Sequence, residues 1–221
     1  FILVAIGIGI AQGMQLNVIV NSIENGIGNT LGFLVMILGF GAMLGKLVAE
    51  SGAAQQITNG LIKIFGVNYT KVAVMLTGFI VGITMFYSVG FVILVPLVFT
   101  VAKATGLSLI GVGLPMLASL SVTHGFLPPH PAPSALSVMF EADIGKTLIY
   151  GVLLSIPAIL ISGPLLTHFL PKVEAKPLKE FMTTRVFKQD ELPSLFNSLS
   201  TALLPVLLIG FSTLISFLIQ E

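Results

Sequence analysis

Two histidines, two hydroxyl side chains and a proline cluster lie together in residues 121–133, SVTHGFLPPHPAP. An imidazole titrates near neutral pH, so His124 or His130 could take up and release a proton. The hydroxyl groups of Ser121 and Thr123 could donate hydrogen bonds to the hydroxyl or carboxylate oxygens of a bound molecule. These residue types therefore predict a site that binds a small polar molecule and handles protons.

The same segment lies inside residues 104–140, which contain no Asp, Glu, Lys or Arg. Each proline lacks a backbone donor and its ring clashes with the preceding turn, so a cluster of prolines cannot continue a helix. In hydrocarbon, unwound backbone is tolerated only where protein buries it or water reaches it. Ionisable side chains at membrane depth indicate function by default. We therefore predict a cavity in the membrane, of the kind in which secondary transporters bind their cargo.

The backbone of this segment has its own predicted roles. Residues that shape or hold the break are Gly125, Pro128, Pro129 and Pro131. Proline is favoured at the first helical position, so Pro133 predicts a new helix start. The free N–H groups of Ser134, Ala135 and Leu136 would then attract an anion, for which a carboxylate is the simplest candidate.

Each of these assignments has a structural alternative. The histidines can simply bond to unwound backbone and lock the break. The hydroxyl groups can bond to a carbonyl one turn earlier, which is their commoner use. The segment after the break can be an ordinary kinked helix whose N–H groups are satisfied by neighbours.

Two further groups of polar residues lie elsewhere in apolar sequence. Tyr87 and Ser88 lie in the middle of the apolar run 72–102, where they either reach a substrate or hydrogen-bond between helices. Lys46 and Glu50 are four residues apart and can pair on one helix face. That pair either ends a span at the interface or forms a buried gate.

The composition predicts the elements that position these residues. Only 9% of the residues are charged, against about 25% in an average soluble domain, and the mean hydropathy is +1.06. Crossing a bilayer takes about 20 apolar residues, and each of the charge-free runs is long enough: 1–23, 25–45, 72–102, 104–140, 147–171 and 192–220. We predict an all-α, polytopic membrane bundle with broken helices, with a connector or interfacial helix at 12–30 and an amphipathic piece at 53–65.

We divide the chain into a transmembrane repeat (1–171), a hydrophilic loop (172–197) and the start of a next transmembrane segment (198–221). The loop carries five of the ten basic residues, which predicts a cytoplasmic location. As one helix, the run 72–102 would be about 46 Å long, longer than a bilayer core of about 30 Å. It therefore either enters and returns as a re-entrant hairpin or comprises two short spans.

Several function classes find no support in the sequence. There is no cysteine, which removes thiolate metal sites and cysteine nucleophiles, and we expect no metal and no cofactor other than a coupling proton. A net charge of +1 without a basic, aromatic-interleaved patch argues against nucleic acid as a partner. The motifs GxSxG, HExxH and the Walker loop are missing, so we do not expect an enzyme. The weak exception is Ser121 with His124, three residues apart on one helical face.

Four stretches of the chain are distinctive: GFGAMLGKLVAESGAAQ (39–55), FYSVGFVILVPLVFT (86–100), LSVTHGFLPPHPAP (120–133) and DIGKTLIYG (143–151). In this order and spacing they resemble the gluconate permease family of bacterial proton symporters. The resemblance implies a multi-pass protein of the bacterial inner membrane, about twice this length, that imports gluconate or a related hydroxy acid with protons. It also implies two inverted repeats, of which this chain is the first. The expected partners are therefore the substrate anion, membrane lipid and the second half of the same protein. A homo-oligomer is a further possibility that the sequence does not decide.

The resemblance leaves alternatives and two departures. Some relatives in the family carry other substrates, including D-serine, and a passive organic-anion channel would also need a polar cavity. Ser88 stands where the family pattern has an acidic residue, so proton coupling in this chain moves to another group, such as His124, or is lost. Ala132 stands where the family usually has glycine, which alters the backbone at the break.

Overall fold

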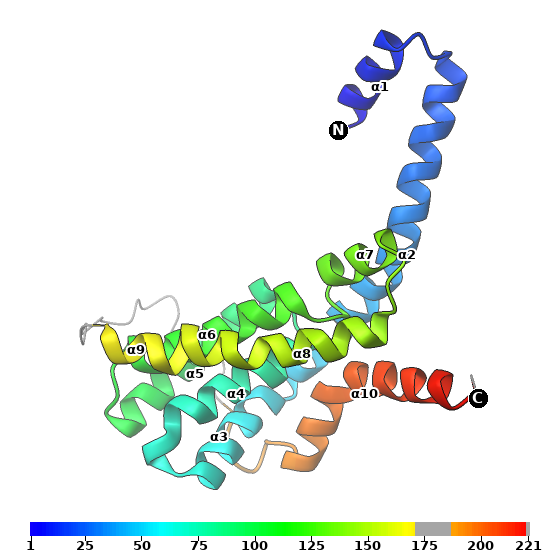
Figure 1. The fold of residues 1–221 in the computed structure, drawn as a ribbon. Coiled ribbons are helices and arrows are strands. Elements are labelled where there is room, and N and C mark those ends of the chain that lie inside the picture. The colour runs from blue at the N-terminus through cyan, green and yellow to red at the C-terminus, as the bar shows by residue number, and fades with distance from the viewer. Residues whose placement is uncertain (171–186, 220–221) are drawn as a thin grey trace. The chain divides into compact units, whose positions relative to one another are not determined.

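The computed structural model describes residues 1–170 and 187–219, and its regular elements are all helical within those ranges. Their order along the chain, shown in Figure 1, is α1 (Ile2–Ala11), α2 (Leu16–Glu50), α3 (Ala53–Phe65), the 3₁₀ turn η1 (Val67–Tyr69), α4 (Thr70–Gly82), α5 (Tyr87–Thr105), α6 (Leu109–Phe126), α7 (Pro131–Met139), α8 (Ile144–Leu160), the π-helical turn η2 (Ile161–Leu165), α9 (Leu166–Phe169) and α10 (Leu195–Ile219). The all-α fold class is therefore confirmed for the described residues.

The chain forms two compact units, residues 1–39 and 40–221. In the first unit, α1 packs on the start of α2. Ile19 is 3% exposed, and a Cβ on Gly9 would lie 2.7 Å from its side chain, so a larger residue at position 9 would force Ile19 to shift. The predicted connector at 12–30 is helical from Leu16 onward, because no proline interrupts α2.

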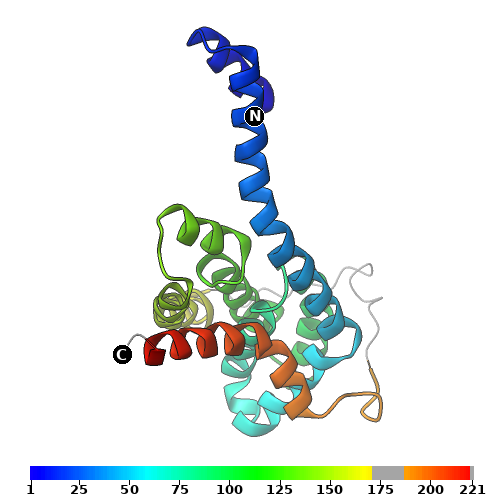
Figure 2. The same cartoon turned by 90° about the vertical axis from the view of Figure 1, so that its right-hand side faces the viewer.

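In the second unit, α6 is the central helix, and α4, α5 and α8 pack against it. The contact between α4 and α6 is close, because a Cβ on Gly78 would collide with the carbonyl oxygen of Met116. Large apolar side chains fill the space among these helices with no exposed surface, including Val74, Leu94, Met116 and Leu120. The two views in Figures 1 and 2 show α6 and α8 running side by side.

Within the described residues, four helical segments are long and apolar enough to cross a membrane: Tyr87–Thr105, Leu109–Met139, Ile144–Phe169 and Leu195–Ile219. A fifth candidate is a pair of helices, Ala53–Phe65 with Val67–Gly82, in which the second helix is bent by 118° from the direction of the first. Gly66 makes this bend with φ +79, in the left-handed region that favours glycine. This finding agrees with a polytopic membrane protein.

The bent pair lies one element earlier than the sequence predicts. The run 72–102 contains parts of two helices, α4 and α5, separated by Ile83–Phe86. Of these two, only α5 is long enough to be a candidate span by itself, so the choice between a re-entrant hairpin and two short spans stays a prediction. The sharp bend joins α3 to α4, because the amphipathic piece at 53–65 is a helix that packs on α4.

The predicted cytoplasmic loop, 172–197, falls mostly outside the described residues. Its end is described, and there the backbone of Phe187 pairs with the side chain of Gln55 on α3. The Gln55 amide donates to the Phe187 carbonyl (2.8 Å) and accepts from the Phe187 N–H (3.0 Å). Helix α10 then begins at Leu195, whose side chain packs against Gly60 of α3.

Candidate functional site

Two interrupted helices meet in the second unit. Helix α4 ends at Gly82 and α5 begins at Tyr87, while α6 ends at Phe126 and α7 begins at Pro131. His130, at the second break, places Nε2 2.7 Å from the carbonyl oxygen of Gly82, at the first break. A carbonyl can only accept, so the ring N–H of His130 donates this bond. The two breaks are thus joined by a hydrogen bond between residues 48 positions apart.

The two predicted imidazoles lie in contact. Nδ1 of His124 is 3.2 Å from Nδ1 of His130, and the ring centroids are 4.6 Å apart. Phe86, from the first break, places its ring edge-on to His124 at 6.2 Å. His130 is 4% exposed, whereas His124 is half-buried. The structure therefore brings both histidines and the α4–α5 break into one cluster.

Packing at Gly82 explains why the two breaks approach so closely. A Cβ on Gly82 would overlap the hydroxyl oxygen of Thr123 and lie 3.2 Å from Leu120. Sequence reasoning missed Gly82, although its spacing of four from Gly78 was a usable signal, because small residues at this spacing let helices approach in membranes.

The proline cluster breaks the helix as predicted, but the new helix starts earlier than predicted. Its first residue is Pro131, not Pro133, with His130 as the N-cap residue. The N–H of Ser134 donates to the carbonyl of His130 (3.1 Å), and Ala135 and Leu136 lie inside α7. These N–H groups therefore do not form the predicted anion site. The reason is that proline tolerates the first turn of a helix, so Pro131 and Pro133 both fit there.

The predicted hydroxyl groups have different environments. Thr123 is fully buried, and its hydroxyl lies 2.8 Å from the Ser119 carbonyl and 2.9 Å from the Leu120 carbonyl. This is the structural alternative, in which a hydroxyl bonds back to its own helix. Ser121 is exposed on α6, and no contact with His124 is described, so these two residues do not form a nucleophile–base pair in the described structure.

The start of α5 has the free backbone N–H groups that the sequence analysis predicted at the start of α7. Tyr87, Ser88 and Val89 are exposed, and Gly90 carries the first N–H that bonds within the helix, to the carbonyl of Phe86 (2.9 Å). Phe86 is the N-cap residue and supplies no side-chain cap. The first three N–H groups of this 19-residue helix are therefore available to an acceptor.

Lys46 and Glu50 form an ion pair of 3.7 Å near the end of α2. Their side chains are 73% and 70% exposed, so the pair is not a buried gate within the described residues. An exposed pair at this spacing contributes about 0.3–0.5 kcal/mol.

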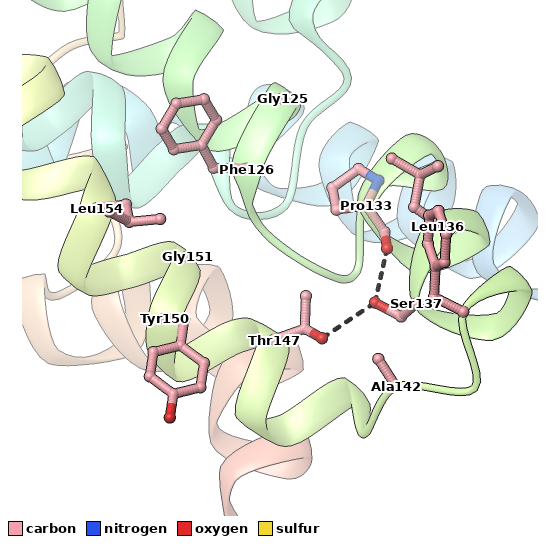
Figure 3. A pocket seen from close by; sticks show the side chains of 11 residues that line it. Gly125, Phe126, Pro133, Leu136, Ser137, Ala142, Thr147, Tyr150, Gly151 and Leu154 are labelled. Carbon is pink, nitrogen blue, oxygen red and sulfur yellow. Dashed lines mark hydrogen bonds between the residues drawn. The ribbon is translucent and has the colours of Figure 1, made fainter.

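A pocket of about 450 Å³ opens beside the second break, between α6, α7 and α8. Figure 3 shows two of its lining residues, Ser137 of α7 and Thr147 of α8, pointing toward each other. The Ser137 hydroxyl is 2.8 Å from the Pro133 carbonyl and 3.2 Å from the Thr147 hydroxyl. The pocket wall is otherwise mostly apolar and includes Gly125 and Tyr150. The sequence analysis missed Ser137 and Thr147. Nothing in the sequence around these two residues distinguishes them from other Ser and Thr residues in apolar helices.

Among the residues that the structure describes, no group of three or more His, Asp or Glu side chains could hold a metal ion.

A family model for GntP family permeases matches residues 1–221, the whole chain. The chain belongs to the GntP permease family. This confirms the resemblance to gluconate permeases that its motifs carried. No solved structure is significantly similar to it.

The curated relatives of this chain are named as transporters and permeases. It is 48% identical to the Gnt-II system L-idonate transporter of Escherichia coli, over 96% of this chain and 48% of the relative. It is 47% identical to a high-affinity gluconate transporter of Escherichia coli, over 100% of this chain and 50% of the relative. It is 42% identical to a gluconate permease of Bacillus subtilis, with the same two shares. The chain thus spans about half the length of the curated relatives it matches.

Proposed function

We propose that this permease chain is the first repeat of a secondary active transporter that imports gluconate, or a related small hydroxy carboxylate, with protons by alternating access. Family membership and the names of its relatives support a sugar-acid permease. The proposal assigns to this chain the sugar-acid transport that the relatives' names state, and it adds proton coupling. Its cellular site would be the inner membrane of a bacterium, with lipid and the second repeat as its neighbours.

The observation that carries the proposal is the meeting of two helix breaks at His130 and Gly82, 2.7 Å apart. Broken helices at membrane depth are the usual binding sites of secondary transporters, because their free backbone groups can bind substrate and ions. In this permease the meeting point combines an imidazole, His124, with the uncapped start of α5.

The start of α5 is the proposed carboxylate site. A helix N-terminus binds anions through unpaired N–H groups and the positive end of the dipole. Tyr87, Ser88 and Val89 supply these N–H groups, and all three residues are exposed. We propose the hydroxyl groups of Tyr87 and Ser88 as further substrate contacts. Ser121, also exposed, is the further hydroxyl that we propose for the substrate's own hydroxyl groups.

Proton coupling supplies enough free energy for uptake. One proton that enters with one carboxylate anion moves no net charge, so the pH gradient drives this uptake. A difference of one pH unit supplies about 1.4 kcal/mol, which matches the cost of a tenfold concentration gradient of substrate. We assign the coupling to the imidazole cluster of His124 and His130, because Ser88 cannot take up a proton.

The test is uptake of labelled gluconate into liposomes that contain the full-length protein, with and without an inward proton gradient. We expect accumulation above the outside concentration only with the gradient, and loss of accumulation when an uncoupler is added. L-Idonate, 2-keto-3-deoxygluconate, D-serine and citrate serve as competitors, and D-serine competing better than the sugar acids would change the substrate class. Equilibration of gluconate without any accumulation would instead identify a passive channel.

A further inference from the structure

The hydrogen bonds of the histidine cluster fix which nitrogen atoms carry protons. The carbonyl of Gly82 only accepts, so Nε2 of His130 carries a hydrogen. A neutral imidazole has one N–H and one lone pair, so the lone pair of His130 is on Nδ1. Nδ1 of His124 lies 3.2 Å away and must therefore donate. The lone pair of neutral His124 is then on Nε2.

We propose that Nε2 of His124 is the atom that takes up the coupling proton, and that His130 is a positioning residue that holds His124 in this tautomer. This inference rests on the proposed function and deepens it, because it chooses between the two imidazoles. Burial agrees with the assignment, since His130 is 4% exposed whereas His124 is half-buried.

The proton step balances within the pair. The lone pair on Nε2 of His124 accepts a proton from water, which makes His124 an imidazolium. The Nδ1–H of His124 keeps donating to the lone pair on Nδ1 of His130, whose Nε2–H stays bonded to the Gly82 carbonyl. His124 therefore holds one proton and releases it from Nε2, the nitrogen by which it entered.

No other titratable side chain has a described contact with either imidazole. The helices packed on α6 carry these titratable residues in the described ranges: Lys71, Tyr87, Lys103, Lys146, Tyr150 and His168. Lys71 bonds to Thr167 (3.2 Å), and the ring of Tyr87 packs on Phe91. Helix α7 carries no titratable group. Among described residues, the titratable contact of each imidazole is thus the other imidazole.

The first test reads the tautomers directly. The full-length protein with ¹⁵N-labelled histidine is reconstituted, and its nitrogen spectrum is assigned with single histidine variants. We expect His124 protonated on Nδ1 and His130 protonated on Nε2. His130→Ala should move His124 to the Nε2–H form that free imidazole prefers, whereas His130→Asn should keep the Nδ1–H form, since the amide oxygen lies where Nδ1 did. His124 protonated on Nε2 in the wild type would overturn the proposal.

The second test measures protons carried per gluconate in liposomes, a ratio that does not depend on the transport rate. The residual flux of His124→Asn should carry no proton, because the second nitrogen is gone, whereas His130→Asn should keep the wild-type ratio. A wild-type ratio in His124→Asn, or a ratio of zero in His130→Asn, would overturn the assignment. A wild type that moves no sugar acid would refute the proposed function alone, because the nitrogen spectrum still reports the tautomers.

Discussion

Gly82→Ala tests whether the two helix breaks are held together by close packing. The new Cβ would overlap the hydroxyl oxygen of Thr123 and lie 3.2 Å from Leu120. Overpacking of a tight contact costs about 1–3 kcal/mol, and the higher helix propensity of alanine returns roughly 0.5–1 kcal/mol. We therefore expect a net loss of about 1–2 kcal/mol in the free energy of unfolding.

The assay is thermal unfolding of the purified protein in detergent, combined with uptake in liposomes. A loss of this size lowers Tm by about 2–8 °C for a domain near this length. The shift also moves the Gly82 carbonyl away from His130, so gradient-driven uptake should fall more than the amount of folded protein. Gly210→Ala is the matched control, because no heavy atom lies within 4 Å of a Cβ there, and its Tm should not fall.

A double variant separates this contact from other effects. Thr123→Ala removes the overlapping oxygen, so Gly82→Ala with Thr123→Ala should recover part of the loss, with a coupling energy of about 0.5–2 kcal/mol. If Gly82→Ala unfolds at the same temperature as Gly210→Ala, the inference that α4 and α6 are closely packed at Gly82 is wrong. The proposed site would then lose its physical basis.

Three further predictions address the ends of the site. Ser88→Glu places a carboxylate beside the free N–H groups of α5, so uptake should fall more steeply with rising pH than in Ser88→Gln; superimposable profiles would contradict this. In a cysteine-free background, Ser88→Cys should react with a small impermeant thiol reagent, and gluconate should protect it. The control Ser119→Cys, at a position with no exposure, should stay unreactive. A Ser88→Cys variant that does not react would argue against the cavity. Lys46→Gln should change the free energy of unfolding by less than about 0.5 kcal/mol and leave uptake within twofold of the wild type. A larger loss of uptake would support the hypothesis that Lys46 and Glu50 form a gate.

Much of the architecture was predictable because it depends on composition. Long runs without charge are compatible only with helices in a bilayer, and the amphipathic piece at 53–65 has the helical bounds that its pattern indicates. The bend at Gly66 was not predicted, since a single glycine between two apolar helices is also compatible with a loop. The start of α7 was misplaced by two residues, because two prolines fit the first turn equally well.

The sequence by itself determined that residues 121–133 interrupt a membrane helix beside ionisable groups, because proline removes donors wherever it stands. The tertiary structure alone decided that Gly82, far away in the chain, ends another helix at the same point and accepts the hydrogen bond of His130. It also moved the free helix N-terminus from α7 to α5. The physical reason is that proline and charge patterns act locally, whereas the partner of a buried polar group is chosen by how the helices pack.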